Sequence, residues 1–234
     1  MTHHLTIDPH FATLVPHFAM AMVEAQVVNT PYSIELQREI DREVAHIALT
    51  QTMESIKQME SIHFTRNAYK ILGKDPNRYR PAAEQLRRRI VNKKGLYTIN
   101  AIVDLGNLLS LITGFSMGLF DAPSVGRDVV MRVGTNADQF EGIGRGELNV
   151  EGLPLYCDEQ GPFANPTSDS ERTKVKNNTS ELLLFINSFT PSEQNAKEAL
   201  IEATELTISM LKRFLNAKEI VSQYHSAKET LLLS

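Results

Sequence analysis

The segment from Arg66 to Asn107 constrains the fold more than any other part of the chain, because charge, turn chemistry and apolar periodicity all change within it. Gly73, Pro76 and Pro81 exclude one continuous helix here, since glycine favours turns and proline removes a backbone donor. Pro81 instead suits the first turn of a new helix, and the apolar stretch over residues 96–112 predicts a second one. The segment therefore predicts helices joined by fixed turns.

Positive charge is concentrated in the same segment. Between Phe64 and Tyr97 there are ten Lys or Arg residues against two acids, a local balance of +8 in a chain of formal net charge −4. Such a patch attracts polyanions whatever the total charge, which predicts a phosphate-bearing partner; the alternative is a solvated helix face. Consecutive arginines at 87, 88 and 89 lie about 100° apart on a helix, so at most two of them share a face.

Length and composition predict an ordinary globular protein. A chain of 234 residues with 42% apolar and 22% charged residues can bury a large core, and one domain spanning residues 1–234 is expected. No apolar run reaches the roughly 18 residues that a membrane-spanning helix needs, and the N-terminus lacks the order of a secretory signal. We expect a cytoplasmic protein with no membrane partner. The one cysteine, Cys157, excludes an internal disulfide and is expected in a buried strand.

Periodicity predicts an α+β fold. Residues 14–28 alternate as a strand with one better-buried face, and residues 33–62 have the spacing of one long amphipathic helix. Residues 115–165 predict short strands separated by glycine turns, residues 182–186 a strand buried on both faces, and residues 192–215 a C-terminal helix.

Three polar residues interrupt the apolar stretch over residues 96–112. Asn100, Asp104 and Asn107 are spaced by four and three, so in a helix they line one stripe. A buried Asn or Asp needs hydrogen-bond partners, which makes such a stripe costly unless it is paired or meets a ligand.

The tract Thr167–Thr173, TSDSERT, consists of seven consecutive polar residues. It could be a loop that folds on its own backbone. Alternatively it is a binding loop, in which Asp169 and Glu171 accept hydrogen bonds from an ammonium group or a ribose hydroxyl, and Arg172 binds a phosphate or carboxylate.

Other common site patterns are excluded. GIGRGE at residues 142–147 precedes no convincing helix, so a tight hairpin is expected there rather than a phosphate-binding loop. The seven histidines form no metal-binding spacing, and His3, His4, His10 and His17 fall near an N-terminus that we expect to be loose. No serine lies in a G-x-S-x-G motif. We expect no metal and no cofactor.

Three blocks in order, RRRIVNKKGLYTINAIVDLGNLLSL, GLFD and SERTKVKNNTSELLLF, resemble the B3/B4 domain of the bacterial phenylalanyl-tRNA synthetase β subunit. There a W-L-x-R-R-L stretch leads to R-P-I-N-N-V-V-D-V-T-N-Y, an H-A-F-D turn and a G-G-E-x-S-x-V-T-x-x-T strand entry. Free-standing B3/B4-type proteins, with R-Y-R-P before the basic helix and a D-S-E-R-T tract, are more similar still. The resemblance covers about residues 66–189.

The resemblance implies a B3/B4-like layered sandwich of mixed sheets with flanking helices. Its core spans about residues 66–189, with an N-terminal strand and helix and a C-terminal helix as extensions. In the synthetase, the domain recognises tyrosine misattached to the tRNA for phenylalanine and hydrolyses the ester. By position, Glu171 matches the glutamate that reads the wrong amino acid's hydroxyl, and Asn100, Asp104 and Asn107 match the I-N-x-x-V-D-x-x-N stripe.

Two departures from the family bear on activity. The threonine of V-D-V-T-N is Gly106 here, and the editing histidine before A-F-D is Gly118. Without these groups, hydrolysis would rely on backbone amides and on the substrate's own ribose hydroxyl. Whether the chain is an enzyme, an aminoacyl-tRNA deacylase, therefore stays open.

The first hypothesis is a protein that interacts with tRNA or aminoacyl-tRNA, without DNA binding, and hydrolyses mischarged tRNA in trans. The alternatives are a small-molecule protein that binds an amino-acid-like ligand without catalysis, and a structural module of a larger assembly. The sequence predicts no oligomeric state. Substrate-binding residues are predicted at Asn100, Asp104, Asn107, Asp169, Glu171, Arg172 and Thr173, and RNA-binding residues at Arg66, Arg78, Tyr79, Arg80, Arg87 and Arg88.

Overall fold

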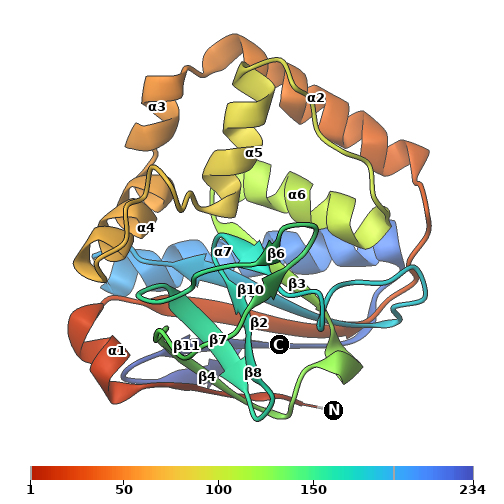
Figure 1. The fold of residues 1–234 in the computed structure, drawn as a ribbon. Coiled ribbons are helices and arrows are strands. Elements are labelled where there is room, and N and C mark those ends of the chain that lie inside the picture. The colour runs from red at the N-terminus through yellow and green to blue at the C-terminus, as the bar shows by residue number, and fades with distance from the viewer. Residues whose placement is uncertain (1, 192, 234) are drawn as a thin grey trace.

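Two five-stranded β-sheets and the helices that cover them form the fold in a computed structural model, which describes residues 2–191 and 193–233 (Figure 1). The outer sheet has the order β1-β4-β7-β8-β9, and the central sheet has the order β12-β11-β2-β10-β3. The strands are β1 (His4–Ile7), β2 (Ala19–Gln26), β3 (Ser116–Asp121), β4 (Asp128–Val133), β5 (Glu141–Gly142), β6 (Gly146–Glu147), β7 (Pro154–Asp158), β8 (Gly161–Asn165), β9 (Ser168–Asp169), β10 (Glu181–Ser188), β11 (Lys218–Ser226) and β12 (Thr230–Leu232). The helices are α1 (Pro9–Leu14), α2 (Ile34–Thr50), α3 (Met53–Gln58), α4 (Glu60–Ile71), α5 (Ala82–Val91), α6 (Ala101–Thr113), the 3-10 turn η1 (Ala122–Ser124) and α7 (Glu193–Leu215).

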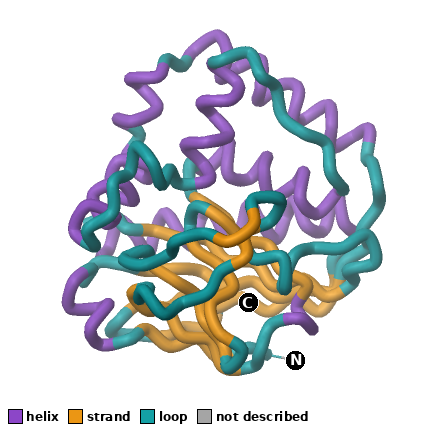
Figure 2. Tube along the Cα trace, viewed as in Figure 1, coloured by secondary structure: helices purple, strands orange, loops and turns teal. Residues whose placement is uncertain are grey.

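The central sheet lies between a helical layer and the outer sheet. Leu182, Leu184 and Ile186 of β10 pack in the same core as α6 and α7, whereas Leu183 and Phe185 pack against residues of the outer sheet. This alternation follows from the period of two along a strand. Figure 2 shows the strands gathered below and most helices above them. Because β1 pairs with β4 in parallel and the other described strand pairs are antiparallel, the predicted α+β sandwich of mixed sheets is confirmed.

The long helix predicted over residues 33–62 is wrong. The chain forms α2, α3 and α4 instead, with extended backbone at Gln51, Thr52 and Met59. Thr52 and Ser55 form a capping box that starts α3, since each side chain accepts a hydrogen bond from the other residue's backbone amide. Apolar periodicity continues through this break, because all three helices bury residues in the same helical layer.

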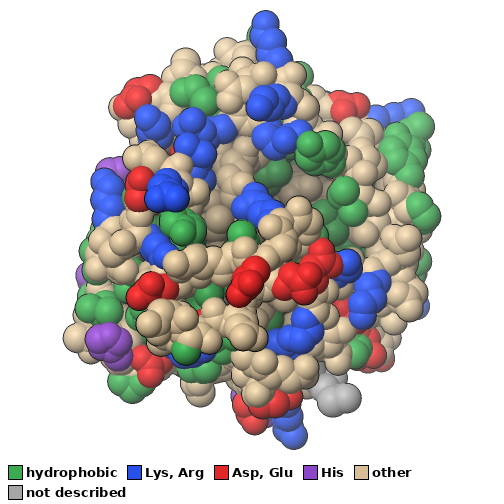
Figure 3. Space-filling model, viewed as in Figure 1, with side chains coloured by type: hydrophobic (Ala, Val, Ile, Leu, Met, Phe, Trp, Pro, Cys, Tyr) green, Lys and Arg blue, Asp and Glu red, His purple; other side chains and the backbone are tan. Residues whose placement is uncertain are grey.

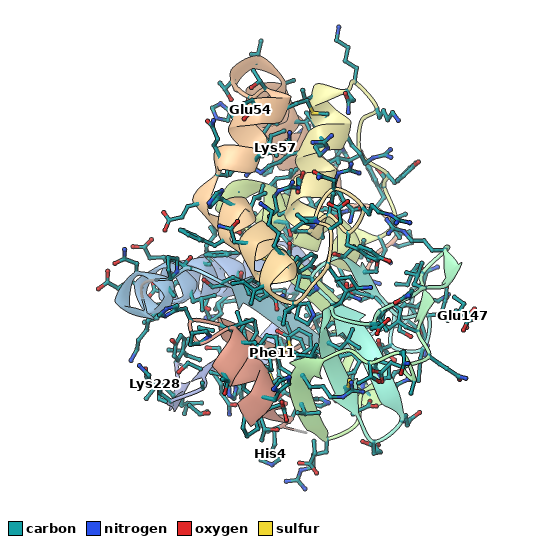
Figure 4. The ribbon with its side chains drawn as sticks, turned by 60° about the vertical axis from the view of Figure 1, so that its left-hand side comes forward. His4, Phe11, Glu54, Lys57, Glu147 and Lys228 are labelled. Carbon is teal, nitrogen blue, oxygen red and sulfur yellow. The ribbon has the colours of Figure 1, made fainter. Side chains whose placement is uncertain are left out.

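The N-terminal part of the chain is ordered into the two sheets, so the expected loose terminus is wrong. His3 is buried and its ring Nδ1 lies 3.0 Å from Glu24 of β2. Strand β2 is shorter than predicted and is buried on both faces, because it lies between the helices and the outer sheet. Figure 4 shows Phe11 pointing from α1 into the molecule, where its ring contacts Phe18.

Several other predictions are confirmed. The structure has a hairpin at residues 141–147, a buried Cys157 in β7, and helices near residues 82–91 and 101–113. Gly114 ends α6 in the left-handed conformation that glycine favours. Helix α7 matches the predicted C-terminal helix, whose proposed first residue, Ser192, lies outside the described residues. The chain then continues into β11 and β12, which the predicted extension omitted. No described helix is long and apolar enough to cross a membrane.

Candidate functional site

The polar tract Thr167–Thr173 is fastened to the β5–β6 hairpin. Ile143 donates a backbone hydrogen bond to the carbonyl of Asp169 at 3.1 Å, and Glu171 donates one to the carbonyl of Glu141 at 3.0 Å. The tract also bonds to nearby chain, since Asn165 Oδ1 accepts from the amides of residues 167 and 168. The tract is therefore held by a partner hairpin rather than folded only on itself.

Glu171 is held as a charged group at the hairpin. Its Oε1 accepts a hydrogen bond from the amide of Gly144 at 3.0 Å, and its other oxygen pairs with Lys174. The bond from Lys174, followed by that from Gly144, lowers the pKa of Glu171. Lys174 partly neutralises this carboxylate, so a ligand ammonium would compete with it.

Asp169 has a different environment. The residue is half-buried in β9, and burial raises the pKa of its carboxyl to about 7, although the Leu119 backbone amide opposes the shift. Near neutral pH both protonation states are populated, which is the condition for a group that takes up or releases a proton during a reaction.

The last two predicted residues of the tract have structural positions. Arg172 turns away from the hairpin and binds both oxygens of the buried Asp158, at 2.9 and 3.0 Å. Its predicted role in binding a ligand phosphate is therefore not supported by its contacts. Thr173 is fully buried, and its Oγ1 has no hydrogen-bond partner among the described residues.

The predicted stripe on α6 begins with a cap. Asn100 is the N-cap of the helix and its side chain accepts a hydrogen bond from the amide of Val103 at 3.1 Å. Asp104 accepts one from the amide of Ile99 at 2.9 Å and is raised in pKa by burial. Asp104 and Asn107 together line a cavity of about 170 Å³ on the side of α6 that faces α2.

The predicted substrate residues therefore lie on two sides of α6. Gly106 faces β3, because a Cβ added to it would lie 2.3 Å from Cδ1 of Leu119. The backbone amide of Leu119 donates a hydrogen bond toward the Asp169 carboxyl, so this side of α6 faces the polar tract. Two residues of helix correspond to about 200°, so Asp104 points away from that side. Among the described residues, no hydrogen bond or ion pair joins the stripe to Glu171. The structure therefore places in two groups the residues that the sequence predicts in one pocket wall.

Gly106 and Gly118, which the resemblance matches to a threonine and a histidine, are closely surrounded. Besides the contact of Gly106 with Leu119, a Cβ on Gly118 would lie 2.5 Å from the ring of Phe120. A histidine at 118 would therefore require the Phe120 ring to move. The space of the missing groups is filled by apolar side chains of β3.

The basic segment is less uniform than its sequence suggests. Arg66 binds the fully buried Glu84 at 2.9 Å, and Arg87 is buried against Gln51 and the carbonyl of Leu111, so neither is free to contact a polyanion. Tyr79 is half-buried beneath the ammonium of Lys74. Burial lowers the pKa of Arg87, which the nearby Glu43 partly offsets.

The cations that reach the surface form what we call the basic face. Its members are exposed or half-buried and come from α4, α5 and the loops beside them: Lys70, Arg78, Arg80, Arg88, Arg89, Lys93 and Lys94. Figure 3 shows Lys and Arg side chains gathered over the upper part of the molecule, above a hollow between α5 and the β5–β6 hairpin. Arg145 links the hairpin to α5 and to the polar tract, since it donates to Gln85 of α5 at 2.9 Å and to Ser168 at 3.3 Å.

Sequence reasoning missed several residues at this place. Lys174 and the amide of Gly144 hold Glu171, and Arg145 joins the hairpin to α5. Tyr97 is 69% exposed with the Arg89 guanidinium 4.2 Å from its ring centre. Two of these have a local sequence signal, since GIGRGE and KKGLY each place a charged or aromatic residue beside turn glycines.

The comparisons with known proteins agree with this architecture. The B3/4 domain family matches residues 65–221. A crystal structure of an N-terminal fragment of the phenylalanyl-tRNA synthetase β subunit from Pyrococcus horikoshii superposes with a TM-score of 0.53 at 14% sequence identity. That match covers 99% of this chain and 54% of the fragment, so the chain spans about half the length of its structural relative. No curated protein matches the sequence. With more than half of its residues matched, the chain belongs to the B3/4 domain family.

Proposed function

We propose that this protein binds tRNA through the basic face and hydrolyses the ester of a mischarged aminoacyl-tRNA in the adjoining hollow. The observation that carries the proposal is the position of the exposed cations above the hollow at α5, where Asp169 and Glu171 are held by the hairpin. Phosphate contacts fix the position of a nucleic acid without reading its sequence, which suits Lys and Arg on a helix end and loop.

Asp169 is the group best suited to act as general base. In this proposal its carboxylate takes a proton from a water molecule as the water oxygen attacks the ester carbonyl carbon. The bond from that carbon to the ribose oxygen then breaks, and the protonated Asp169 returns its proton to the leaving ribose oxygen. A base with a pKa of about 7 is well matched to reaction near neutral pH. The substrate's own neighbouring hydroxyl would stabilise the developing oxyanion, since the amides of Ile143 and Gly144 already donate to Asp169 and Glu171.

Glu171 has a binding role in the same proposal. Its carboxylate stays ionised because Lys174 and the Gly144 amide stabilise the charge. A ligand hydroxyl or ammonium could bind it by displacing Lys174, whose side chain is 44% exposed and free to move toward solvent.

A panel of mischarged tRNAs, each labelled on the amino acid, tests the activity. We expect loss of at least one aminoacyl ester to be accelerated by the protein, and Asp169→Asn to reduce that rate by about 10²–10⁴-fold. Asp128→Asn, an exposed carboxylate on β4, serves as the matched control and should leave the rate unchanged. Absence of ester loss across the panel would remove the catalytic part of the proposal.

The small-molecule alternative predicts a different result. A binding protein without catalysis would be stabilised against heat by a free amino-acid-like ligand in the absence of RNA, since a ligand that binds only the folded state raises its stability. It would also show no salt-dependent binding of tRNA. The observation that supports this alternative is the cavity of about 170 Å³ beside Asp104.

A further inference from the structure

Tyr97 is exposed on the loop that joins α5 to α6. The loop spans residues 92–100 and runs alongside α2 (Figure 1). Tyr97 is 69% exposed, and the guanidinium carbon of Arg89 lies 4.2 Å from the centre of its ring. Single exposed apolar residues are common on protein surfaces, so the exposure of Tyr97 alone does not mark a site. The features that point to a ligand are the position of Arg89 and the charge of the loop.

Arg89 is held against the ring by the backbone of the same loop. Its Nε donates a hydrogen bond to the carbonyl of Gly95 at 3.1 Å, and a terminal nitrogen donates to the carbonyl of Lys94 at 3.5 Å. The guanidinium plane lies over the ring as a cation–π pair. One face of the Tyr97 ring is therefore covered by a positioned cation, and the rest of the side chain stays open to solvent.

The turn that ends α5 fixes the loop in turn. The amide of Lys93 donates to the carbonyl of Ile90 at 2.8 Å, and the amide of Lys94 donates to the carbonyl of Arg89 at 2.9 Å. Leu96 packs against the apolar cores of the helical layer. A ligand that binds this loop meets groups that are already ordered, which lowers the entropic cost of binding.

The loop is strongly positive. No Asp or Glu occurs in the sequence between Glu84 and Asp104, and Lys93 and Lys94 are exposed. Neither lysine forms an ion pair within residues 2–191 and 193–233. Carboxylates of Asp41 and Asp104 line the small cavity on the α2 side of the loop. An anion is therefore expected at the α5 end of the loop, where the lysines lie.

An aromatic ring backed by a guanidinium and flanked by lysines is typical of a surface that binds single-stranded RNA. Unpaired bases stack on aromatic rings and on Arg guanidinium planes, and basic side chains bind the phosphates between them. A protein partner matches the surface less well, because Lys is depleted in protein interfaces. Base pairs inside a duplex offer no open face to the ring, so the ligand needs an unpaired nucleotide.

We propose that Tyr97, with Arg89 behind it, stacks on an unpaired base of an RNA. Lys93 and Lys94 bind the phosphates beside that base. The identification of the RNA as a tRNA rests on the proposed function. Tyr97 borders the α2 side of α6, whereas Asp169 adjoins the β3 side. The stacked base is therefore not that of the esterified nucleotide, and it belongs to another unpaired part of the RNA.

A short oligouridine that carries one 2-aminopurine tests the inference, because the fluorescence of 2-aminopurine falls when the base stacks on an aromatic ring. We expect the parent protein to bind this strand and to quench the fluorescence. Tyr97→Leu should bind about tenfold more weakly, which is the effect of one lost base stack, and should not quench. Tyr97→Phe should keep both properties. Unchanged affinity in Tyr97→Leu, or no binding by the parent, would overturn the inference.

The duplex of the same strand with its complement separates stacking from an effect on the loop. Tyr97→Leu should bind the duplex as the parent does, and an equal loss of affinity for the duplex would contradict stacking. Stacking releases no counterions, so Tyr97→Leu should keep the parent's dependence on salt, whereas the double variant Lys93→Ala and Lys94→Ala should reduce it. Tyr32→Leu, at another exposed tyrosine, is the matched control and should bind the single strand as the parent does.

Uncharged tRNA distinguishes failure of this inference from failure of the proposed function. If Tyr97→Leu and the parent bind both tRNA and the single strand equally, the inference is wrong and the proposed tRNA binding stands. If the parent binds and quenches the single strand but does not bind tRNA, the stacking site stands and the proposed function is wrong. Binding of neither RNA by the parent would contradict both.

Discussion

Leu119 leaves no room for a side chain at Gly106, because a Cβ at 106 would lie 2.3 Å from Cδ1 of Leu119. The pair joins the middle of α6 to β3 beside Asp169. The contact here is apolar, between the backbone of α6 and a leucine side chain of β3.

Gly106→Ala should therefore lower the free energy of unfolding by about 1–2 kcal/mol, even though alanine is the better helix former. Chemical denaturation measures the change. When Leu119→Ala is combined with Gly106→Ala, the glycine substitution should lower the free energy of unfolding less than it does in the parent. A double-mutant cycle with no coupling energy between the two positions would contradict the contact.

The carboxyl of Asp169 should make stability depend on pH. Its folded pKa is about 7 against an ordinary value of 3.8, so between these values the folded state binds more protons than the unfolded state. Stability from this group is present below about pH 4 and is lost as the pH rises to about 7. Asp169→Asn should remove this loss of stability at high pH. At pH 8 its free energy of unfolding should exceed that of the parent by about 1–3 kcal/mol, a range reduced because Asp169 is partly exposed to solvent. Urea unfolding from pH 4 to pH 8 measures it, and parallel curves for the two proteins would refute the shifted pKa.

The buried ion pair of Glu84 should matter for stability rather than for RNA. Glu84 is fully buried and accepts from Arg66 at 2.9 Å, with Arg88 3.6 Å away. Glu84→Ala leaves a buried cation unpaired and should cost about 3–5 kcal/mol. Glu54→Ala is the control, since Glu54 and Lys57 are exposed on α3 at 3.9 Å (Figure 4) and such pairs contribute under about 1 kcal/mol. Similar losses in both variants would contradict this assignment.

Local signals in the sequence were sufficient for much of the fold. The stop at Gly114, the helix start after Pro81 and the alternation of β10 each depend on residues within a few positions, and each was predicted. The break at Thr52 was missed because apolar spacing continues across it, although the Thr52–Ser55 capping box was readable. Strand β11 was missed because its pairing with β2 joins residues far apart in the chain.

The candidate site depended more strongly on distant contacts. The tract at residues 167–173 was identified from its polarity, but Arg172 was assigned to a ligand because its partner, Asp158, lies on another strand. Arg87 was placed on the surface for a similar reason, since three consecutive arginines give no indication of which one enters the protein. The stripe on α6 lies apart from Glu171 because Gly106, not Asp104, is the residue of α6 that faces β3. Which side of α6 faces the sheet is determined by packing between distant parts of the chain.

Binding of uncharged tRNA at several salt concentrations tests whether the basic face binds nucleic acid. Affinity should fall steeply with salt, and a variant with Lys93 and Lys94 changed to alanine should have a smaller salt slope, by about one for each cation removed. A matched variant with Lys212 and Lys218, exposed near the C-terminal end of α7, changed to alanine should keep the parent slope. Absence of salt-dependent binding, or equal slopes in the two variants, would contradict a tRNA-binding role for the basic face.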